Sequence, residues 1–248
     1  MLTLRHHNSN DYEILPDIDD TDAGIITVGD QSCLDEIGDC LLEAKVQSRF
    51  AVTLLHSHFP IDDDETLLEE VNVNGHVMTL RPVRGRPSGV FATNICFDDA
   101  GACGKELKLV GLEFASSETL SGIIPINDSD RNVLTSVVGI LRRHWKTRRF
   151  GVRLLHDPLD LKGDVLLETC DPINRVLTCR SDAVDGLTSV RSIPTVFRWE
   201  EAQVRSGNGA VTSQECIQFC RTVQRCLAPT RGSHSRSSSH EPTGHQSI

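Results

Sequence analysis

The alternation of hydrophobic and polar positions predicts the same succession of elements twice along the chain. In each copy a short β-branched segment, GIITV at 24–28 or GIIPI at 122–126, comes before an amphipathic helix. The first helix is expected to begin at Ser32, with Asp35 three residues later as a variant of the capping box. The second carries its apolar stripe over 134–145. Each helix is expected to cover one face of a sheet.

After each helix the pattern becomes that of strands. The segment 51–56 carries adjacent leucines, which is typical of a central strand covered on both faces. Strands at 67–73 and 76–81 flank Asn74 and Gly75, a dipeptide that favours a type I′ hairpin. We expect about five strands in the first copy, and four with a terminal helix in the second.

The repeat is also visible residue by residue. The stretch FAVTLLHSHFPIDDDETLLE at 50–69 recurs as FGVRLLHDPLDLKGDVLLE at 150–168, and 33–49 aligns with 133–149 without a gap. Further aligned pairs are 77–81 with 176–180, 93–100 with 195–202 and 111–115 with 216–220. Two copies of about a hundred residues indicate a duplicated domain, because solenoid repeats have periods of roughly 20–50 residues.

These patterns predict an α+β fold built by tandem duplication of a module of ~100 residues, each a mainly antiparallel sheet with one covering helix. The expected divisions are a disordered acidic leader at 1–22, module 1 at 23–120, module 2 at 121–228 and a disordered Ser/His-rich tail at 229–248.

Composition places the chain among ordinary soluble proteins, with 38% hydrophobic and 24% charged residues. No apolar run approaches the ~18 residues that a membrane span needs, and no secretory signal is recognisable. We therefore expect a cytoplasmic protein without a membrane partner. The net charge of -10 argues against general binding to nucleic acid. No cofactor is expected.

The nine cysteines contain no CxxC pair, which excludes a zinc ribbon or a thioredoxin-like centre. Cys216, Cys220 and Cys226 are candidates to share a metal, although thiols four residues apart on an amphipathic segment more often belong to a core.

His56 and His58 are separated by one residue at the end of a strand, so both side chains can project from the same face. Together with a carboxylate such as Asp62 they are candidate ligands of a divalent metal. His56, His58 and Glu69 are also the candidate catalytic residues.

The second copy argues for a structural role instead. It keeps His156 in the place of His56 but has Pro158 in the place of His58. On this interpretation His56 and His156 each tie the end of a strand to the following loop through ring hydrogen bonds.

Glu69 and Glu168 occupy equivalent positions in the two copies. We expect them to pair with Arg81 and Arg180 across their hairpins, because cross-strand pairs of opposite charge are stabilising. The alternative is that each glutamate and histidine forms an acid/base pair in a cleft between the modules.

The segment RRHWKTRR at 142–149 places positive charge at the end of the second helix, where it complements the helix dipole. The alternative is a contact with nucleic acid in which Trp145 stacks on a base. The residues concerned are Arg142, Arg143, Trp145, Lys146, Arg148 and Arg149.

The stretch FAVTLLHSHFPIDDDETLLEE at 50–70 resembles a family of small uncharacterised proteins from fungi and actinobacteria with a Leu-Leu-His-x-His-Phe signature before an acidic loop. That family implies no activity. In size and character the chain is also similar to accessory proteins of fungal secondary-metabolite clusters of the loline alkaloid type.

Three hypotheses follow. The first is a non-catalytic accessory or binding protein for a small molecule or a protein partner, involved in alkaloid biosynthesis. The second is a small metal-assisted or acid/base enzyme that uses His56, His58 and Glu69. The third is a regulator that contacts nucleic acid through Arg142–Arg149.

Overall fold

A computed structural model describes residues 1–18, 22–98, 106–116, 123–156, 159, 165–182, 192–202 and 211–221. Its helical elements are α1 (Ser9–Glu13), α2 (Val28–Glu43), η2 (Asp128–Asp130) and α3 (Arg131–Arg143). Its strands are β1 (Leu2–His6), β2 (Phe50–Leu54), β3 (Glu65–Asn72), β4 (Val77–Arg84), β5 (Val90–Phe97), β6 (Leu107–Ser116), β7 (Phe150–Leu154), β8 (Val165–Asp171), β9 (Val176–Asp182), β10 (Ser192–Ala202) and β11 (Val211–Arg221).

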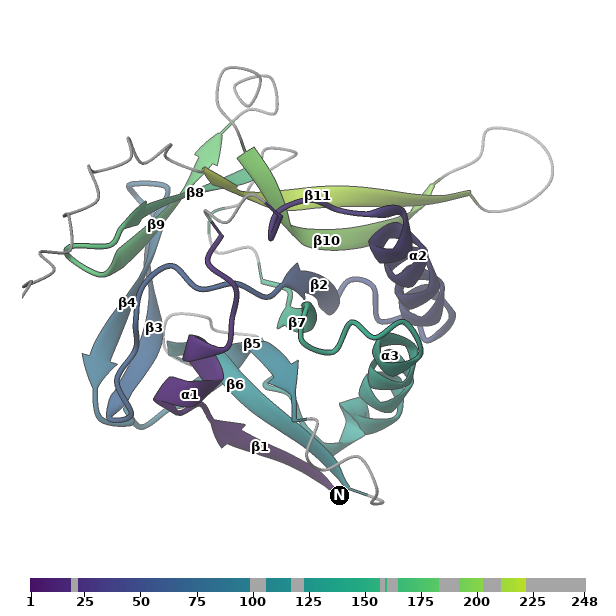
Figure 1. The fold of residues 1–248 in the computed structure, drawn as a ribbon, viewed down its shortest axis with the longest axis horizontal. Coiled ribbons are helices and arrows are strands. Elements are labelled where there is room, and N and C mark those ends of the chain that lie inside the picture. Colours follow the sequence, from purple (N-terminus) through teal and green to yellow (C-terminus); the bar gives the residue numbers. More distant parts are fainter. Residues whose placement is uncertain are drawn as a thin grey trace, which may run out of the picture.

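The strands form a closed ten-stranded barrel in the order β6-β3-β4-β9-β8-β11-β10-β2-β7-β5, which closes because β5 pairs with β6 (Figure 1). Strand β1 lies outside the ring, parallel to β6. The predicted α+β fold of two tandem modules, each with its own sheet and covering helix, is therefore wrong. Strands of the two copies pair with each other at β4–β9, β2–β7, β2–β10 and β5–β7, so one barrel contains both.

The repeated sequences nevertheless occupy equivalent places in the ring. Strand β3 runs parallel to β6 with Glu69 opposite Ala115, and β8 runs parallel to β11 with Glu168 opposite Cys220. Strands β2 and β7 lie antiparallel with Val52 opposite Val152, which is the centre of an approximate twofold axis. The segment 216–220, expected to be helical, is part of strand β11.

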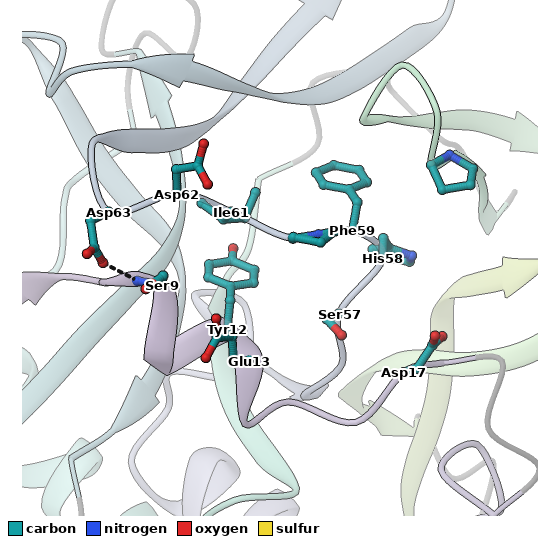
Figure 2. A pocket seen from close by; sticks show the side chains of 12 residues that line it. Ser9, Tyr12, Glu13, Asp17, Ser57, His58, Phe59, Ile61, Asp62 and Asp63 are labelled. Carbon is teal, nitrogen blue, oxygen red and sulfur yellow. Dashed lines mark hydrogen bonds between the residues drawn. The ribbon is translucent and has the colours of Figure 1, made fainter. Parts of the chain in front are cut away.

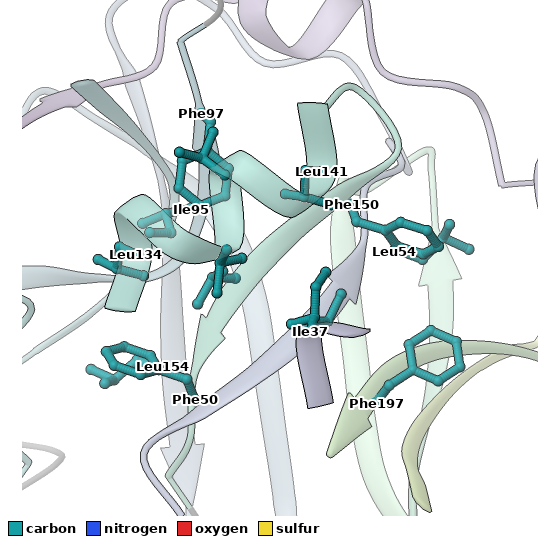
Figure 3. Packing of buried hydrophobic residues seen from close by; sticks show 14 of the residues in the cluster. Ile37, Phe50, Leu54, Ile95, Phe97, Leu134, Leu141, Phe150, Leu154 and Phe197 are labelled. Atoms are coloured by element: carbon teal, nitrogen blue, oxygen red, sulfur yellow. The ribbon is translucent and has the colours of Figure 1, made fainter. Parts of the chain in front are cut away.

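The helices α2 and α3 lie side by side beyond β2 and β7, with β10–β11 on one side and β5–β6 on the other (Figure 1). Their apolar faces pack on alternate residues of the two central strands, including Phe50, Leu54 and Phe150 (Figure 3). All five residues of β2 are buried, as expected for a strand covered on both faces. The opposite faces of β2 and β7 therefore face the interior of the barrel.

The start of α2 differs from the prediction. The helix begins at Val28, and Thr27 forms the capping box with Asp30, so Ser32 lies inside the helix instead of at its cap. Asn127 and Asp130 make the corresponding capping box before α3. The earlier cap agrees better with the repeat, because Thr27 and Asn127 are aligned.

Ion pairs cross between the halves at both helix starts. Arg49, which follows α2, donates from Nε to Asp130 Oδ1 over 2.9 Å, and Arg149 donates in the same way to Asp30 over 2.9 Å. The backbone repeats the exchange, since Leu55 N donates to Arg149 O and Leu155 N to Arg49 O, both at 2.8 Å. These reciprocal contacts link the two copies around the twofold axis.

The expectation of a disordered leader at 1–22 is wrong for residues 1–18, which form β1 and α1. Tyr12 of α1 is buried and its hydroxyl donates to Leu112 O over 2.7 Å. The predicted tail at 229–248 lies outside the described residues.

The β3–β4 hairpin is confirmed, but its connection is a four-residue loop at 73–76 with His76 at φ 49°, in place of a two-residue turn. Arg175 has the equivalent conformation in the β8–β9 hairpin, at φ 56°.

Candidate functional site

Two buried polar clusters lie inside the barrel, and each combines residues of both copies of the repeat. The Arg153 cluster consists of Glu69, Thr93, Glu113, Arg153 and His156. The His58 cluster consists of His56, His58, Glu168, Gln218 and Cys220. Strand registers make the clusters equivalent, yet they hold different residue types. The difference between them is the main chemical asymmetry of the protein.

The Arg153 cluster is a compensated ion network. His156 Nε2 lies 2.7 Å from Glu69 Oε2, and Thr93 donates to Glu69 Oε1 over 2.5 Å. Arg153 lies between two carboxylates, 3.3 Å from Glu69 Oε1 and 2.9 Å from Glu113 Oε2. Each oxygen of Glu69 therefore has a partner.

These contacts shift the ionisation of the network. Burial raises the pKa of Glu69, but the charges of His156 and Arg153 outweigh it and hold that pKa at about 2. Burial lowers the pKa of His156, but the interaction with Glu69 outweighs it, so the pKa is raised. Glu113 behaves differently, because burial raises its pKa more than Arg153 lowers it. Both shifts favour the charged form of the Glu69–His156 pair.

The His58 cluster has a different arrangement. His56 Nδ1 donates to Leu54 O over 2.7 Å, and the Nε2 atoms of His56 and His58 lie 2.9 Å apart. Gln218 donates to Glu168 Oε1, while Glu168 Oε2 lies 3.7 Å from His56 Nε2 and 3.6 Å from His58 Nε2. These last separations are too long for hydrogen bonds.

Burial and neighbouring charges shift the pKa values of the two imidazoles in opposite directions. Burial lowers the pKa of His56, but its interactions with Glu168 and the carbonyl of Leu54 outweigh it, so the pKa is raised. Burial and the neighbouring His56 lower the pKa of His58 to about 4. Burial raises the pKa of Glu168, but His56 and His58 outweigh it and hold the value at about 2. These shifts favour an ionised Glu168, a neutral His58 and the protonated form of His56.

A pocket of about 470 Å³ reaches His58 from outside, and we name it the α1 pocket. Helix α1 and the following chain form one side and segment 57–63 the other (Figure 2). The described residues of its lining include four carboxylates, those of Glu13, Asp17, Asp62 and Asp63, and no lysine or arginine. Tyr12, Phe59 and Ile61 contribute apolar surface.

The sequence-predicted site is brought together only in part. His56 and His58 do converge, but their carboxylate comes from Glu168 of the second copy, whereas Glu69 contacts His156. Asp62 lines the α1 pocket and does not belong to the cluster. The ring contacts expected of His56 and His156 are present, each with the carbonyl two residues earlier.

The predicted pairing of Glu69 with Arg81 is wrong. Arg81 instead contacts the exposed Glu70 at 2.6 Å, because Glu69 points into the barrel and Arg81 points outward. Each histidine lies near the glutamate of the other copy, with His156 Nε2 2.7 Å from Glu69 and His56 Nε2 3.7 Å from Glu168. An acid/base role for these residues stays a prediction.

The basic segment at 142–149 is largely engaged by acids of α2. Lys146 and Arg149 both contact the buried Asp30, at 2.6 and 2.9 Å, and Arg143 and His144 both contact Glu36. Trp145 is 92% exposed. A nucleic-acid contact through this segment stays a prediction, with fewer cations available to it.

Four residues of the two clusters were not identified from the sequence as site residues: Thr93, Glu113, Arg153 and Gln218. Cys220 was a metal candidate, but with Cys216 and Cys226 as its expected partners. One signal was present, since an arginine inside the apolar strand FGVRLL is expected to need a buried acid. The aligned residue of the first copy is Thr53.

Comparisons with protein-family models, with curated proteins and with solved structures find no match to this chain. The resemblance to proteins with the Leu-Leu-His-x-His-Phe signature stays a prediction. Within the described part of the chain, no helix has the length and apolar character required to cross a membrane.

Proposed function

We propose that the protein is a binding protein for a small cationic molecule with an apolar part, such as a protonated amine, and that the α1 pocket is its site. The observation that carries this proposal is that the lining, as far as the structure describes it, has four carboxylates and no basic side chain apart from His58. A cation entering the pocket gains attraction from several acids, while Phe59 and Ile61 provide apolar contact. Ligand pockets have volumes of about 300–1,000 Å³, so the size is suitable.

The similarity to accessory proteins of alkaloid clusters supports the same ligand class, because alkaloids are amines. A role in such a pathway and a cytoplasmic location are parts of the proposal. Helix α1 forms one wall of the pocket, and it is held in place by the buried Tyr12.

Calorimetric titration with a matched ligand set tests the proposal. A bicyclic amine, its N-acetyl derivative and a carboxylate of the same skeleton differ mainly in charge. We expect saturable binding of the amine alone, weakened by Glu13→Gln and by Asp62→Asn. Asp39→Asn on the exposed face of α2 is the matched control and should bind as the wild type does. Equal affinity for the three ligands, or binding unaffected by both pocket variants, would refute a cation site.

A second function, an acid/base enzyme, is favoured by one observation. His58 belongs both to the pocket lining and to the His58 cluster, so a bound molecule would lie beside two adjacent imidazoles and the carboxylate of Glu168. A catalytic role predicts turnover of a bound amine derivative that His58→Gln abolishes without loss of binding. Binding without any chemical change, measured by mass spectrometry, would leave the binding function alone.

A further inference from the structure

Glu168 is a buried carboxylate whose charge is only partly compensated. Its side chain is 3% exposed, and Oε1 accepts a hydrogen bond from Gln218. Among the described residues Oε2 has no hydrogen-bond partner, and the same is true of His58 Nδ1. Leaving a buried charged oxygen in this condition is costly, and such a group in a native structure often indicates a bound ion.

The Arg153 cluster shows how the charge of the equivalent glutamate is neutralised. There the carboxylate of Glu69 is contacted by the guanidinium of Arg153 as well as by His156. The residue equivalent to Arg153 is Thr53, which carries no charge. The His58 cluster therefore lacks the permanent cation that the Arg153 cluster contains.

The imidazole of His56 is oriented as that of a metal ligand is. A carbonyl oxygen can only accept, so His56 must carry a proton on Nδ1, the atom 2.7 Å from Leu54 O. Neutral His56 therefore presents the lone pair of Nε2 toward Glu168 and His58. A hydrogen bond from the distal ring nitrogen to a backbone carbonyl is the usual way in which a ligating histidine is held. Gln218 holds the carboxylate of Glu168 in a similar way.

The distances fit a first-row transition metal. His56 Nε2, His58 Nε2 and Glu168 Oε2 form a triangle with sides of 2.9, 3.7 and 3.6 Å. The circle through these three atoms has a radius of about 2.0 Å, which is the length of a zinc–nitrogen or zinc–carboxylate bond. The sulfur of Cys220 supplies a fourth ligand atom, and all four atoms lie within 4.8 Å of one another.

We propose that His56, His58, Glu168 and Cys220 bind a divalent zinc-like metal ion, which supplies to this cluster the positive charge that Arg153 supplies to the other. Two imidazoles, a thiolate and a carboxylate suit zinc or cobalt better than magnesium or calcium, which prefer oxygen alone. The residues equivalent to Cys220 and His58 are Ala115 and the proline at 158, so the repeat does not form a second such site. The ion would join β8 and β11 to the end of β2, and thereby connect both copies. This inference does not depend on the ligand of the α1 pocket.

Titration of the full-length protein with Co²⁺ and Zn²⁺ after removal of metal by a chelator, under a reducing agent, tests the site. We expect one equivalent of Co²⁺ to bind and to give the visible bands of a tetrahedral complex together with a thiolate-to-cobalt charge-transfer band. Zn²⁺ should displace Co²⁺ and abolish the bands. Cys220→Ala should remove the charge-transfer band, and His58→Ala should weaken Zn²⁺ binding by on the order of a hundredfold or more.

Matched variants separate this site from other thiols and histidines. Cys216→Ala, on the same strand as Cys220, and His156→Ala, in the Arg153 cluster, should leave the cobalt spectrum unchanged. The spectrum of the wild type decides the matter even if a variant fails to fold. Absence of saturable Co²⁺ binding by the wild type, or a charge-transfer band that persists in Cys220→Ala, would overturn the proposal.

Discussion

The replacement Glu69→Gln isolates the charge at the centre of the Arg153 cluster. Glutamine keeps the size of the side chain and can still contact Thr93 and His156, so the variant removes the charge with little change in packing. Glu69 is 1% exposed, and solvent therefore screens its interactions weakly.

The magnitude follows from the ionisation of this carboxyl. Its pKa is lowered from 4.5 to about 2, and each pKa unit corresponds to 1.36 kcal/mol, so ionised Glu69 stabilises the fold by about 3 kcal/mol. Because the folded-state pKa is the lower one, this contribution is complete above about pH 4.5. It is lost as the pH falls toward 2. Glu69→Gln should therefore cost about 3 kcal/mol at pH 7 and progressively less below pH 4.5.

Urea denaturation followed by circular dichroism at pH values from 7 to about 2.5 measures this difference directly. Glu70→Gln is the matched control, since Glu70 is the next residue on β3 but is exposed and paired with Arg81. We expect the control to change the unfolding free energy by less than about 0.5 kcal/mol. An identical pH dependence for Glu69→Gln and wild type would refute the assignment of Glu69 as a charged, compensated group.

Three further predictions concern the two halves. Arg49→Ala should lower the unfolding free energy by on the order of 2 kcal/mol, because it leaves Asp130 at a helix start without its guanidinium. Arg149→Ala should cost less, because Asp30 keeps its contact with Lys146. A larger loss for Arg149→Ala than for Arg49→Ala, measured by urea denaturation, would contradict these assignments. Gly151→Ala should lower the unfolding free energy by ~1–3 kcal/mol or more, measured by thermal denaturation, because a Cβ there would lie 2.3 Å from a backbone oxygen. Gly139→Ala should be neutral or stabilising by up to ~1 kcal/mol. Equal effects of the two variants would argue against this packing of β7. In NMR titrations the pKa of His156 should lie above 6.5. The stabilisation from protonated His156 should be complete below about pH 6.5 and disappear as the pH rises through the raised pKa. A normal pKa in the wild type would contradict the ion pair with Glu69.

Alignment of the two copies predicted local structure well, because each copy gives independent evidence for the elements of the other. Strands β2 and β7, both hairpins and the equivalence of 111–115 with 216–220 follow from aligned residues, and the parallel registers of β3–β6 and β8–β11 agree with them. Closure of the barrel was not predictable in this way. Pairing between copies depends on contacts between residues about a hundred positions apart, and a single sequence carries no signal for them.

The candidate site was incomplete for the same reason. The spacing of His56 and His58 correctly placed two imidazoles on one face, because that inference needs only strand geometry. Their carboxylate was expected within the same copy, at Glu69, but the barrel exchanges partners and supplies Glu168. Likewise the leader was expected to be disordered from its polarity, although a few apolar side chains such as Tyr12 and Ile18 are enough to hold it on the barrel.

The most direct measurement of the central claim is a crystal structure of the zinc-treated protein with diffraction data collected on both sides of the zinc absorption edge. The account predicts one anomalous peak per chain, about 2.0–2.3 Å from the ligand atoms of His56, His58, Glu168 and Cys220. Beside Glu69, where Arg153 provides the positive charge, it predicts no peak. A well-ordered barrel without anomalous density at Glu168, or with density only at surface residues, would contradict it.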